Sequence, residues 1–260
     1  MPTLRGVTLD LWRTLMEDTQ EVGRARFQYR MGGIQAILVE AGVAVDADQL
    51  RTASRACFRA CEGIRGLERE LSFTDQVDLF MNLVEPGLAT RLSAGAKGRI
   101  REVYGAMPSP HTPTVAPGAV EVLRALRDEG YALALISNTG VTPGATLRGL
   151  LADLELLPHL NVLVFSDEVG MVKPAEGIFR LALERMGVAA PEAAHVGDHP
   201  KADVLGGNRA GMWTVQVASS QEREQVAEPH VRIPVLAELP GALERIRDGA
   251  VSQTPVRSTG

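Results

Sequence analysis

The sequence contains few cysteines, few aromatic residues and no long apolar run. Its two cysteines, Cys57 and Cys61, are too few for a disulfide framework and have no nearby partners that would complete a zinc site. No segment approaches the ~20 apolar residues of a membrane-spanning helix. The apolar run at 7–11 is too short for a secretory signal and is interrupted by Asp10. We therefore expect a cytoplasmic protein with reduced cysteines.

The chain also lacks an excess of positive charge. Lysine and arginine number 27 against 32 aspartates and glutamates, which gives a formal net charge of −5. Aromatic residues make up only 4% of the chain and are not interleaved with basic clusters. Because nucleic acids and anionic membranes are bound through basic patches, we expect neither as a partner. At 260 residues the chain can hold one large domain or two smaller ones, and a monomer and a homodimer both remain open.

Helix and strand patterns fall into separate parts of the sequence. Residues 21–107 show helical periodicity, with helix-capping patterns that start at Asp46 and Ser72. Outside this block, short apolar runs alternate with amphipathic stretches. Alternating strands and helices predict an α/β fold, a Rossmann-like parallel sheet with helices on both faces. The expected strands include 5–10, 131–136, 161–165, 195–196 and 213–217.

The helical block predicts an all-helical cap domain inserted into the α/β domain. We expect the core domain to comprise residues 1–16 and 110–248, and the cap domain residues 17–109. Residues 249–260 are rich in serine, threonine and glycine and are expected to form a disordered tail. A cap that is joined to the core by two adjacent linkers can open and close over one edge of the sheet.

Polar residues follow several of the predicted strands, at the points where the strands end. Parallel strands place their carboxyl ends at one edge of the sheet, so these side chains are expected to meet there. A carboxylate nucleophile, a hydroxyl group, an ammonium group and further carboxylates that hold a divalent cation suit phosphoryl transfer. The residues are Asp10, Ser137, Asn138, Lys173, Asp198 and Asp203.

Four stretches at these positions resemble the four motifs of the haloacid dehalogenase-like (HAD) hydrolase superfamily. They are TLDLWRTL at 8–15, ISNTG at 136–140, VKPAEGIF at 172–179 and HVGDHPKAD at 195–203. They occur in the order of the family motifs, and the helical block between the first two is similar to the helical cap of this family. The resemblance implies a hydrolase that acts on a small anionic substrate.

The resemblance also implies a role for each matching residue. Asp10 would be the catalytic nucleophile, and Lys173 would neutralise negative charge beside it. Ser137, with Asn138 next to it, would bind the transferred group, and Thr14 would order the first loop and border the substrate.

Magnesium is the cofactor that the resemblance implies. Its ligands would be Asp10, the backbone carbonyl of Trp12, Asp198 and Asp203. Carboxylate and carbonyl oxygens are the ligands that this cation prefers in proteins.

The first motif departs from the pattern of the family's phosphatases at Trp12 and Arg13. Those enzymes carry a second aspartate two residues after the nucleophile, which protonates the leaving oxygen, and a glycine follows it. The indole N–H of Trp12 is not a usable acid, and loss of a general acid typically costs about 10²–10⁴ in rate. We expect Trp12 and Arg13 to line the substrate pocket, with Arg13 beside an anionic group.

Three functions therefore remain open. The first is a phosphohydrolase whose substrate has a good leaving group, such as an acyl phosphate. The second is a 2-haloacid dehalogenase, since halide leaves without a proton and the family's dehalogenases also lack the second aspartate; Asp198 and Asp203 argue against it. The third is a non-catalytic protein that binds a ligand in the same cleft.

Overall fold

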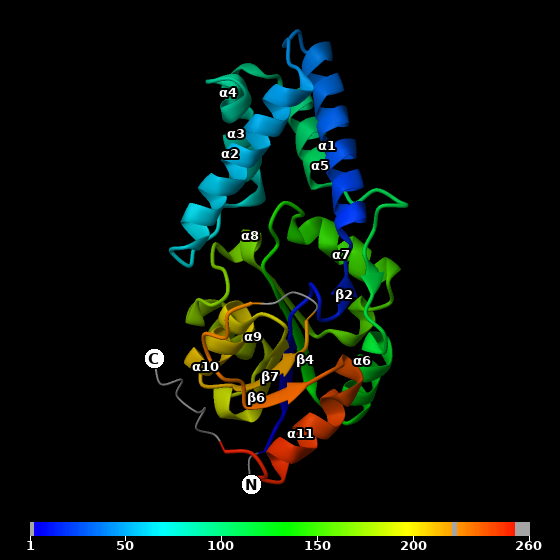
Figure 1. Cartoon of the computed structure of the whole chain (residues 1–260), viewed down its shortest axis with the longest axis vertical. Helices are drawn as coiled ribbons and strands as arrows, with labels where there is room; N and C mark the ends of the chain where they lie inside the picture. Colours follow the sequence, from blue (N-terminus) through cyan, green and yellow to red (C-terminus); the bar gives the residue numbers. More distant parts are fainter. Residues whose placement is uncertain (1–2, 220–222, 253–260) are drawn as a thin grey trace.

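Six strands form one parallel sheet in the computed structural model, which describes residues 3–219 and 223–252 (Figure 1). The order across the sheet is β5-β4-β1-β6-β7-β8, and every neighbouring pair is parallel. The predicted Rossmann-like α/β fold is confirmed. The strands are β1 Gly6–Leu9, β4 Ala132–Ser137, β5 Val162–Phe165, β6 Ala193–Gly197, β7 Trp213–Val217 and β8 Val231–Ile233.

Strand β1 lies in the middle of the sheet, between β4 and β6. All four of its residues are buried, as expected of a parallel strand that is covered on both faces. Leu9 pairs in register with Leu135 of β4 and Val196 of β6. The next residue, Asp10, therefore emerges at the carboxyl edge of the sheet, level with the ends of both neighbours.

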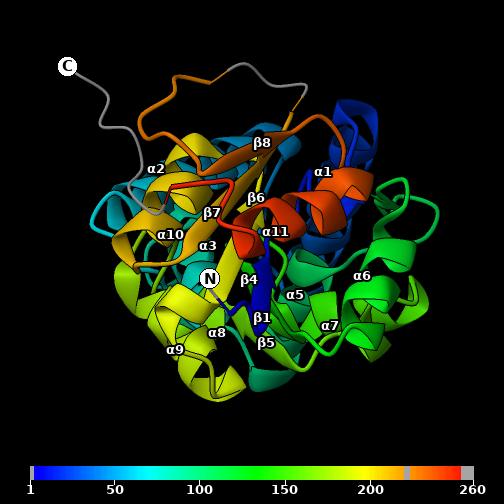
Figure 2. The ribbon, with the colours of Figure 1, turned by 90° about the horizontal axis from the view of Figure 1, so that it is seen from below.

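Helices cover both faces of the sheet (Figure 2). In β4, Leu133 and Leu135 pack in one apolar cluster, whereas Ala134 and Ile136 pack in the cluster on the opposite face. This alternation follows from the two-residue period of a strand. Helices α6 Ala119–Asp128, α7 Gly144–Asp153 and α11 Leu239–Arg247 cover the first face, and α9 Glu176–Met186 and α10 Gly206–Arg209 the second.

Five helices form a separate group beyond the carboxyl edge of the sheet (Figure 1). They have their own apolar cluster, which includes Ile34, Leu50 and Phe80. The capping box predicted at Asp46 is present, with Gln49 as its partner at the start of α2. The helices are α1 Gln20–Glu40, α2 Ala47–Arg65, α3 Phe73–Val84, α4 Leu88–Arg91 and α5 Ala94–Gly105.

The two connections between these helices and the sheet lie side by side. Strands β2 Met16–Glu17 and β3 Thr114–Val115 form a small antiparallel ribbon, in which Met16 pairs with Val115. The five helices thus join the sheet domain through this two-stranded ribbon, a geometry that suits a hinge. The strand signal of these two-residue segments is too short to recognise in the sequence.

Several other elements differ from the sequence-based expectation. Strand β6 spans five residues where two were predicted, and β8 and α11 were not predicted. The remaining turns of helix are α8 Ser166–Val169, a π-helical segment Pro200–Leu205, and 3-10 turns at Leu157–His159, Ala190–Glu192 and Leu236–Glu238. Of the predicted disordered tail, residues 253–260 lie outside the described residues. Within 3–219 and 223–252, no helix is both long and apolar enough to cross a membrane.

Candidate active site

Asp10 lies at the centre of the carboxyl edge of the sheet. Its backbone N–H donates a hydrogen bond to the carbonyl of Val196 at 2.8 Å, which holds it between β1 and β6. Its carboxylate accepts hydrogen bonds from Lys173 Nζ at 2.5 Å and from the Thr14 hydroxyl at 3.5 Å. Burial raises the pKa of Asp10 to about 7, with Lys173 opposing the shift and Asp203 adding to it. Any further cation beside Asp10 favours its ionised, nucleophilic form.

Lys173 bridges two carboxylates. Its Nζ donates to Asp10 and, at 2.7 Å, to Asp203 Oδ1. Burial alone would lower the pKa of Lys173, but the charges of Asp10 and Asp203 outweigh it, so the pKa lies above its ordinary value. Lys173 is therefore a buried cation at neutral pH, which places a fixed positive charge beside the candidate nucleophile.

Asn138 holds the backbone of Lys173. Its Oδ1 accepts a hydrogen bond from the Lys173 N–H at 2.9 Å, and its Nδ2 donates to the Lys173 carbonyl at 3.1 Å. Both polar groups of this side chain are thus committed to Lys173. The structure makes Asn138 a positioning residue for the lysine, and the predicted contact with the transferred group would have to come from its neighbour Ser137.

Ser137 is the last residue of β4 and is fully buried. Its hydroxyl has no hydrogen-bond partner among the described residues. A buried polar group without a partner costs about 1–3 kcal/mol, a cost that a ligand oxygen would remove. The contact predicted between Ser137 and the transferred group stays a prediction.

His195 supports Asp203 from below the site. The two residues face each other at 3.1 Å between His195 Nε2 and Asp203 Oδ1, and His195 Nδ1 lies 2.7 Å from the Thr8 hydroxyl. Burial would raise the pKa of Asp203, but Lys173 and His195 reverse this and hold it below its usual range. Asp203 Oδ2 also accepts a hydrogen bond from the backbone N–H of His199 at 2.9 Å.

The sequence predicted that His195 and Thr8 lie in strands and assigned neither a role in the site. Both are buried on neighbouring strands, and they are paired in register. The signal that could have identified them is the pairing of two polar residues in strands whose other positions are apolar. It becomes visible only once β1 and β6 are known to be neighbours.

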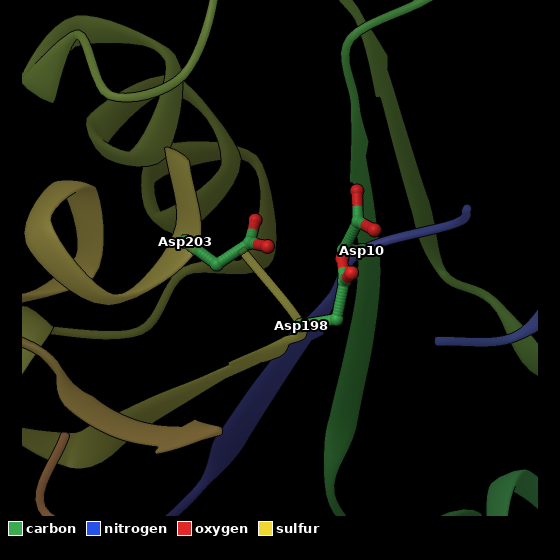
Figure 3. Close-up of side chains that lie close together, drawn as sticks. All are labelled: Asp10, Asp198 and Asp203. Atoms are coloured by element: carbon green, nitrogen blue, oxygen red, sulfur yellow. The ribbon is translucent and has the colours of Figure 1, made fainter. Parts of the chain in front are cut away.

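Asp10, Asp198 and Asp203 form a buried acidic cluster. One carboxylate oxygen of each lies within 4.8 Å of the others, and the three groups approach one another at the edge of the sheet (Figure 3). Carboxylates this close raise each other's pKa unless positive charge offsets the repulsion. Three hard oxygen donors close together are the type of ligand that Mg²⁺ prefers. The donor set therefore matches the predicted cofactor.

Two arginines contact Asp198 on the side of the cluster that faces solvent. Arg223 Nη1 lies 2.7 Å from Asp198 Oδ2, and Arg13 Nη1 lies 3.6 Å from the same oxygen. Arg223 was not predicted, because it belongs to a loop 25 residues after Asp198 and its position depends on the fold. The guanidinium of Arg13 is thus beside the acidic cluster.

The turn after Asp10 is tight. Arg13 adopts φ of 63°, a left-handed conformation that favours glycine, and its N–H donates to the Met16 carbonyl. This conformation costs a non-glycine residue roughly 1–2 kcal/mol. Trp12 is half-buried and packs against the apolar cluster of the sheet domain. No acid stands at position 12 to protonate a leaving group.

A cleft of about 370 Å³ opens at this edge of the sheet. Asn138 and Lys173 line it from the sheet domain, and Glu62 and Arg65 line it from α2. The helical group therefore contributes one wall of the site. A substrate held at Asp10 would lie between the two parts of the molecule.

A buried polar chain joins the end of α2 to the sheet domain beside this cleft. Arg65 Nε donates to Glu70 Oε2 at 2.9 Å, and the Ser166 hydroxyl donates to the same oxygen at 3.2 Å. The Ser166 hydroxyl in turn accepts a hydrogen bond from the Thr139 N–H at 3.0 Å. The position of the helical group over the site is thus coupled to the loop that follows Ser137.

Residues 4–211 match the model of the haloacid dehalogenase-like hydrolase family. Over 148 residues the chain is 35% identical to haloacid dehalogenase-like hydrolase domain-containing protein 3 of Mus musculus, a match that covers 55% of this chain and 57% of that protein. Over 124 residues it is 40% identical to the phosphoserine phosphatase of Thermus thermophilus, covering 47% and 49%.

The chain thus spans about half the length of these curated relatives in the matched regions. Among solved structures, a 2-haloacid dehalogenase from Pseudomonas syringae pv. Tomato has the same fold, with a TM-score of 0.65 and 22% identity over 94% of this chain and all of that one. Relatives and structural neighbours therefore include both a phosphatase and a dehalogenase.

Proposed function

Because this chain belongs to the haloacid dehalogenase-like hydrolase family, we propose that it is a Mg²⁺-dependent phosphohydrolase of a small anionic metabolite with a good leaving group. The observation that carries this proposal is the buried cluster of Asp10, Asp198 and Asp203 around Lys173. Lys173 contacts Asp10 and Asp203, and one oxygen of Asp198 lies within 4.8 Å of an oxygen of each of these two, so three carboxylates are close enough together to hold a cation besides the lysine.

In the proposed reaction, Asp10 Oδ attacks phosphorus and forms an aspartyl phosphate. The bond from phosphorus to the leaving oxygen breaks, and its electron pair departs with that oxygen. Lys173 and the Ser137 hydroxyl bind phosphoryl oxygens during this transfer. Water then attacks the same phosphorus, which releases phosphate and restores the Asp10 carboxylate.

The proposed metal ligands are Asp10, Asp198, Asp203 and the backbone carbonyl of Trp12. Asp203 also accepts hydrogen bonds from Lys173 and from the His199 N–H, so it holds Lys173 in place as well. Bound Mg²⁺ supplies charge neutralisation between the carboxylates and the dianionic phosphoryl group.

We expect the purified protein to hydrolyse acetyl phosphate with Mg²⁺ and to lose this activity with EDTA. Acetate departs without a proton, so the missing acid at position 12 does not limit this substrate. Phosphate release is the measurement. Metal-independent chloride release from 2-chloropropionate, with no phosphate release in either condition, would contradict the proposal and favour a dehalogenase.

The dehalogenase remains the second candidate because of one observation, the absence of an acid at Trp12. Halide leaves as an anion and needs no proton donor. The buried Asp198 and Asp203 argue against it, since they would repel the carboxylate of a haloacid. The buried Lys173, 2.5 Å from Asp10, argues against a non-catalytic binding protein.

The substitution Trp12→Asp tests the account of the leaving group. A carboxylic acid at this position would be able to protonate a leaving oxygen, and general acids contribute about 10²–10⁴ in rate. We expect kcat for a poor leaving group, such as glycerol phosphate, to rise at least about tenfold relative to kcat for acetyl phosphate. Trp12→Phe is the matched control, since it changes the same side chain without adding an acid. An equal ratio in both variants would refute this account.

A further inference from the structure

A second cavity of about 370 Å³ lies between the cap helices and the sheet domain. Figure 1 shows α1 and α5 diverging from α2 and α3 toward the sheet, and the cavity is formed by residues of these four helices and of the loop after β4. Of the six phenylalanines and three tyrosines in the chain, three line this space. Three arginines, a serine and a glutamine also line it, and its apolar and sulfur-containing lining residues are Phe27, Cys57, Phe58, Cys61, Tyr104 and Val141.

The cap cavity adjoins the catalytic cleft. Arg65 lines both spaces, and the consecutive residues Gly140 and Val141 line one each. The guanidinium of Arg65 is held by Glu62 and Glu70, each at 2.9 Å, so it forms a fixed part of the boundary. Lys173, which contacts Asp10, lines the cleft, so a leaving group that reached from there past Arg65 would enter the cap cavity.

Tyr104, one of the three rings that line the cap cavity, is supported from behind. Tyr104 packs against Phe80 and Phe73, with ring centroids 5.1 and 6.2 Å away. Its hydroxyl donates to Cys57 Sγ at 3.9 Å, so the tyrosine presents a ring with its polar group already used. Preformed aromatic walls of this kind bind flat apolar groups.

Part of this lining is apolar surface in contact with solvent. Phe58 is 57% exposed and Val141 is 36% exposed. One residue comes from α2 and the other from the loop after β4, and both border the same cavity. A ligand that covers both would remove apolar area from water at about 25 cal/mol per Å².

The first loop points independently to the same kind of ligand. Because Trp12 cannot donate a proton, the leaving oxygen must depart as an anion. A phenol does so far more readily than an aliphatic alcohol, and its aromatic ring matches the walls of the cap cavity. The chemistry at position 12 favours a leaving group that departs as an anion, and the rings of the cap cavity favour an aromatic one.

We propose that the substrate is an aryl phosphate whose ring occupies the cap cavity, an inference that rests on the proposed phosphohydrolase function. The bond between Asp10 Oδ and phosphorus forms as the bond between phosphorus and the aryl oxygen breaks. The electron pair leaves with the aryl oxygen as an aryloxide, which then takes a proton from water.

A binding experiment that needs no turnover tests this proposal. We expect the protein with Mg²⁺ to bind 2-naphthylmethylphosphonate at least about tenfold more tightly than methylphosphonate, because only the first carries a ring. Phe58→Ala is expected to remove most of this preference. Tyr29→Ala, which removes a 49% exposed ring outside the cavity lining, is expected to keep it. Calorimetric titration gives all the dissociation constants.

Equal binding of the two phosphonates by the unsubstituted protein would overturn the proposal. A preference that survives in Phe58→Ala, or that is lost equally in Tyr29→Ala, would also overturn it. Hydrolysis of acetyl phosphate by the unsubstituted protein reports separately on the phosphohydrolase function. Turnover of acetyl phosphate without any preference for the naphthyl compound would mean that the protein is a phosphohydrolase but that its substrate is not an aryl phosphate.

Discussion

Asp10→Asn is expected to lower kcat for acetyl phosphate by at least about 10⁴, because loss of a nucleophile removes the covalent route altogether. The amide is close to the carboxylate in size, but it has no charge with which to attack phosphorus. It also loses the ion pair with Lys173, whose Nζ lies 2.5 Å from Asp10. Steady-state phosphate release measures the effect.

Asp48→Asn is the matched control for this substitution. Asp48 is an exposed residue of the first turn of α2, paired with Arg51 on the same helix. We expect the Asp48→Asn variant to keep the activity of the unsubstituted protein. A variant of Asp10 that retains more than about a tenth of the activity would rule out the aspartyl phosphate, since general binding effects cannot replace a nucleophile.

The second large effect is expected for Lys173→Met, which leaves Asp10 and Asp203 buried without their shared cation. Loss of one partner of a buried ion pair costs about 3–5 kcal/mol, so the free energy of unfolding in urea at pH 7 should fall by about this amount. Activity should fall as well, because the pKa of Asp10 would rise further and less of it would be ionised.

The loss of stability in Lys173→Met should depend on pH. The pKa of Asp203 in the folded protein lies below its ordinary value. Ionised Asp203 therefore stabilises the folded protein at pH values above about 4, which is the pKa of an aspartate in the unfolded chain. This contribution disappears as pH falls through the folded pKa. The difference in the free energy of unfolding between the unsubstituted protein and Lys173→Met should therefore become smaller in acid. Lys97→Met removes a lysine of α5 outside the site and should change stability by less than about 0.5 kcal/mol; an equal loss in both variants would refute the argument.

Much of the sheet could be predicted from the sequence because its signals are local. An apolar run followed by a polar residue identifies β1 and Asp10, and the position of Ser137 at the end of β4 follows in the same way. The carboxyl ends of parallel strands share an edge, so these residues were expected to lie near one another. The capping box of Asp46 and Gln49 lies within one helical turn and needs no tertiary information.

Other features were out of reach of a local pattern. Strand β8 has only three residues, of which Arg232 is exposed, so it shows too little periodicity to recognise. Asn138 was predicted to lie beside the transferred group, but its amide is bonded to the backbone of Lys173. Periodicity identifies the face of an element on which a residue lies. It does not identify the residue that faces it.

The sequence by itself determined the α/β fold, the family motifs and the residues at the strand ends, because each depends on order and spacing along the chain. Only the tertiary structure decided which groups surround them. It placed His195 and Thr8 behind Asp203, and aromatic residues of the cap next to the catalytic cleft. These contacts join residues that are far apart in sequence, and only the packing of separate elements brings such residues together.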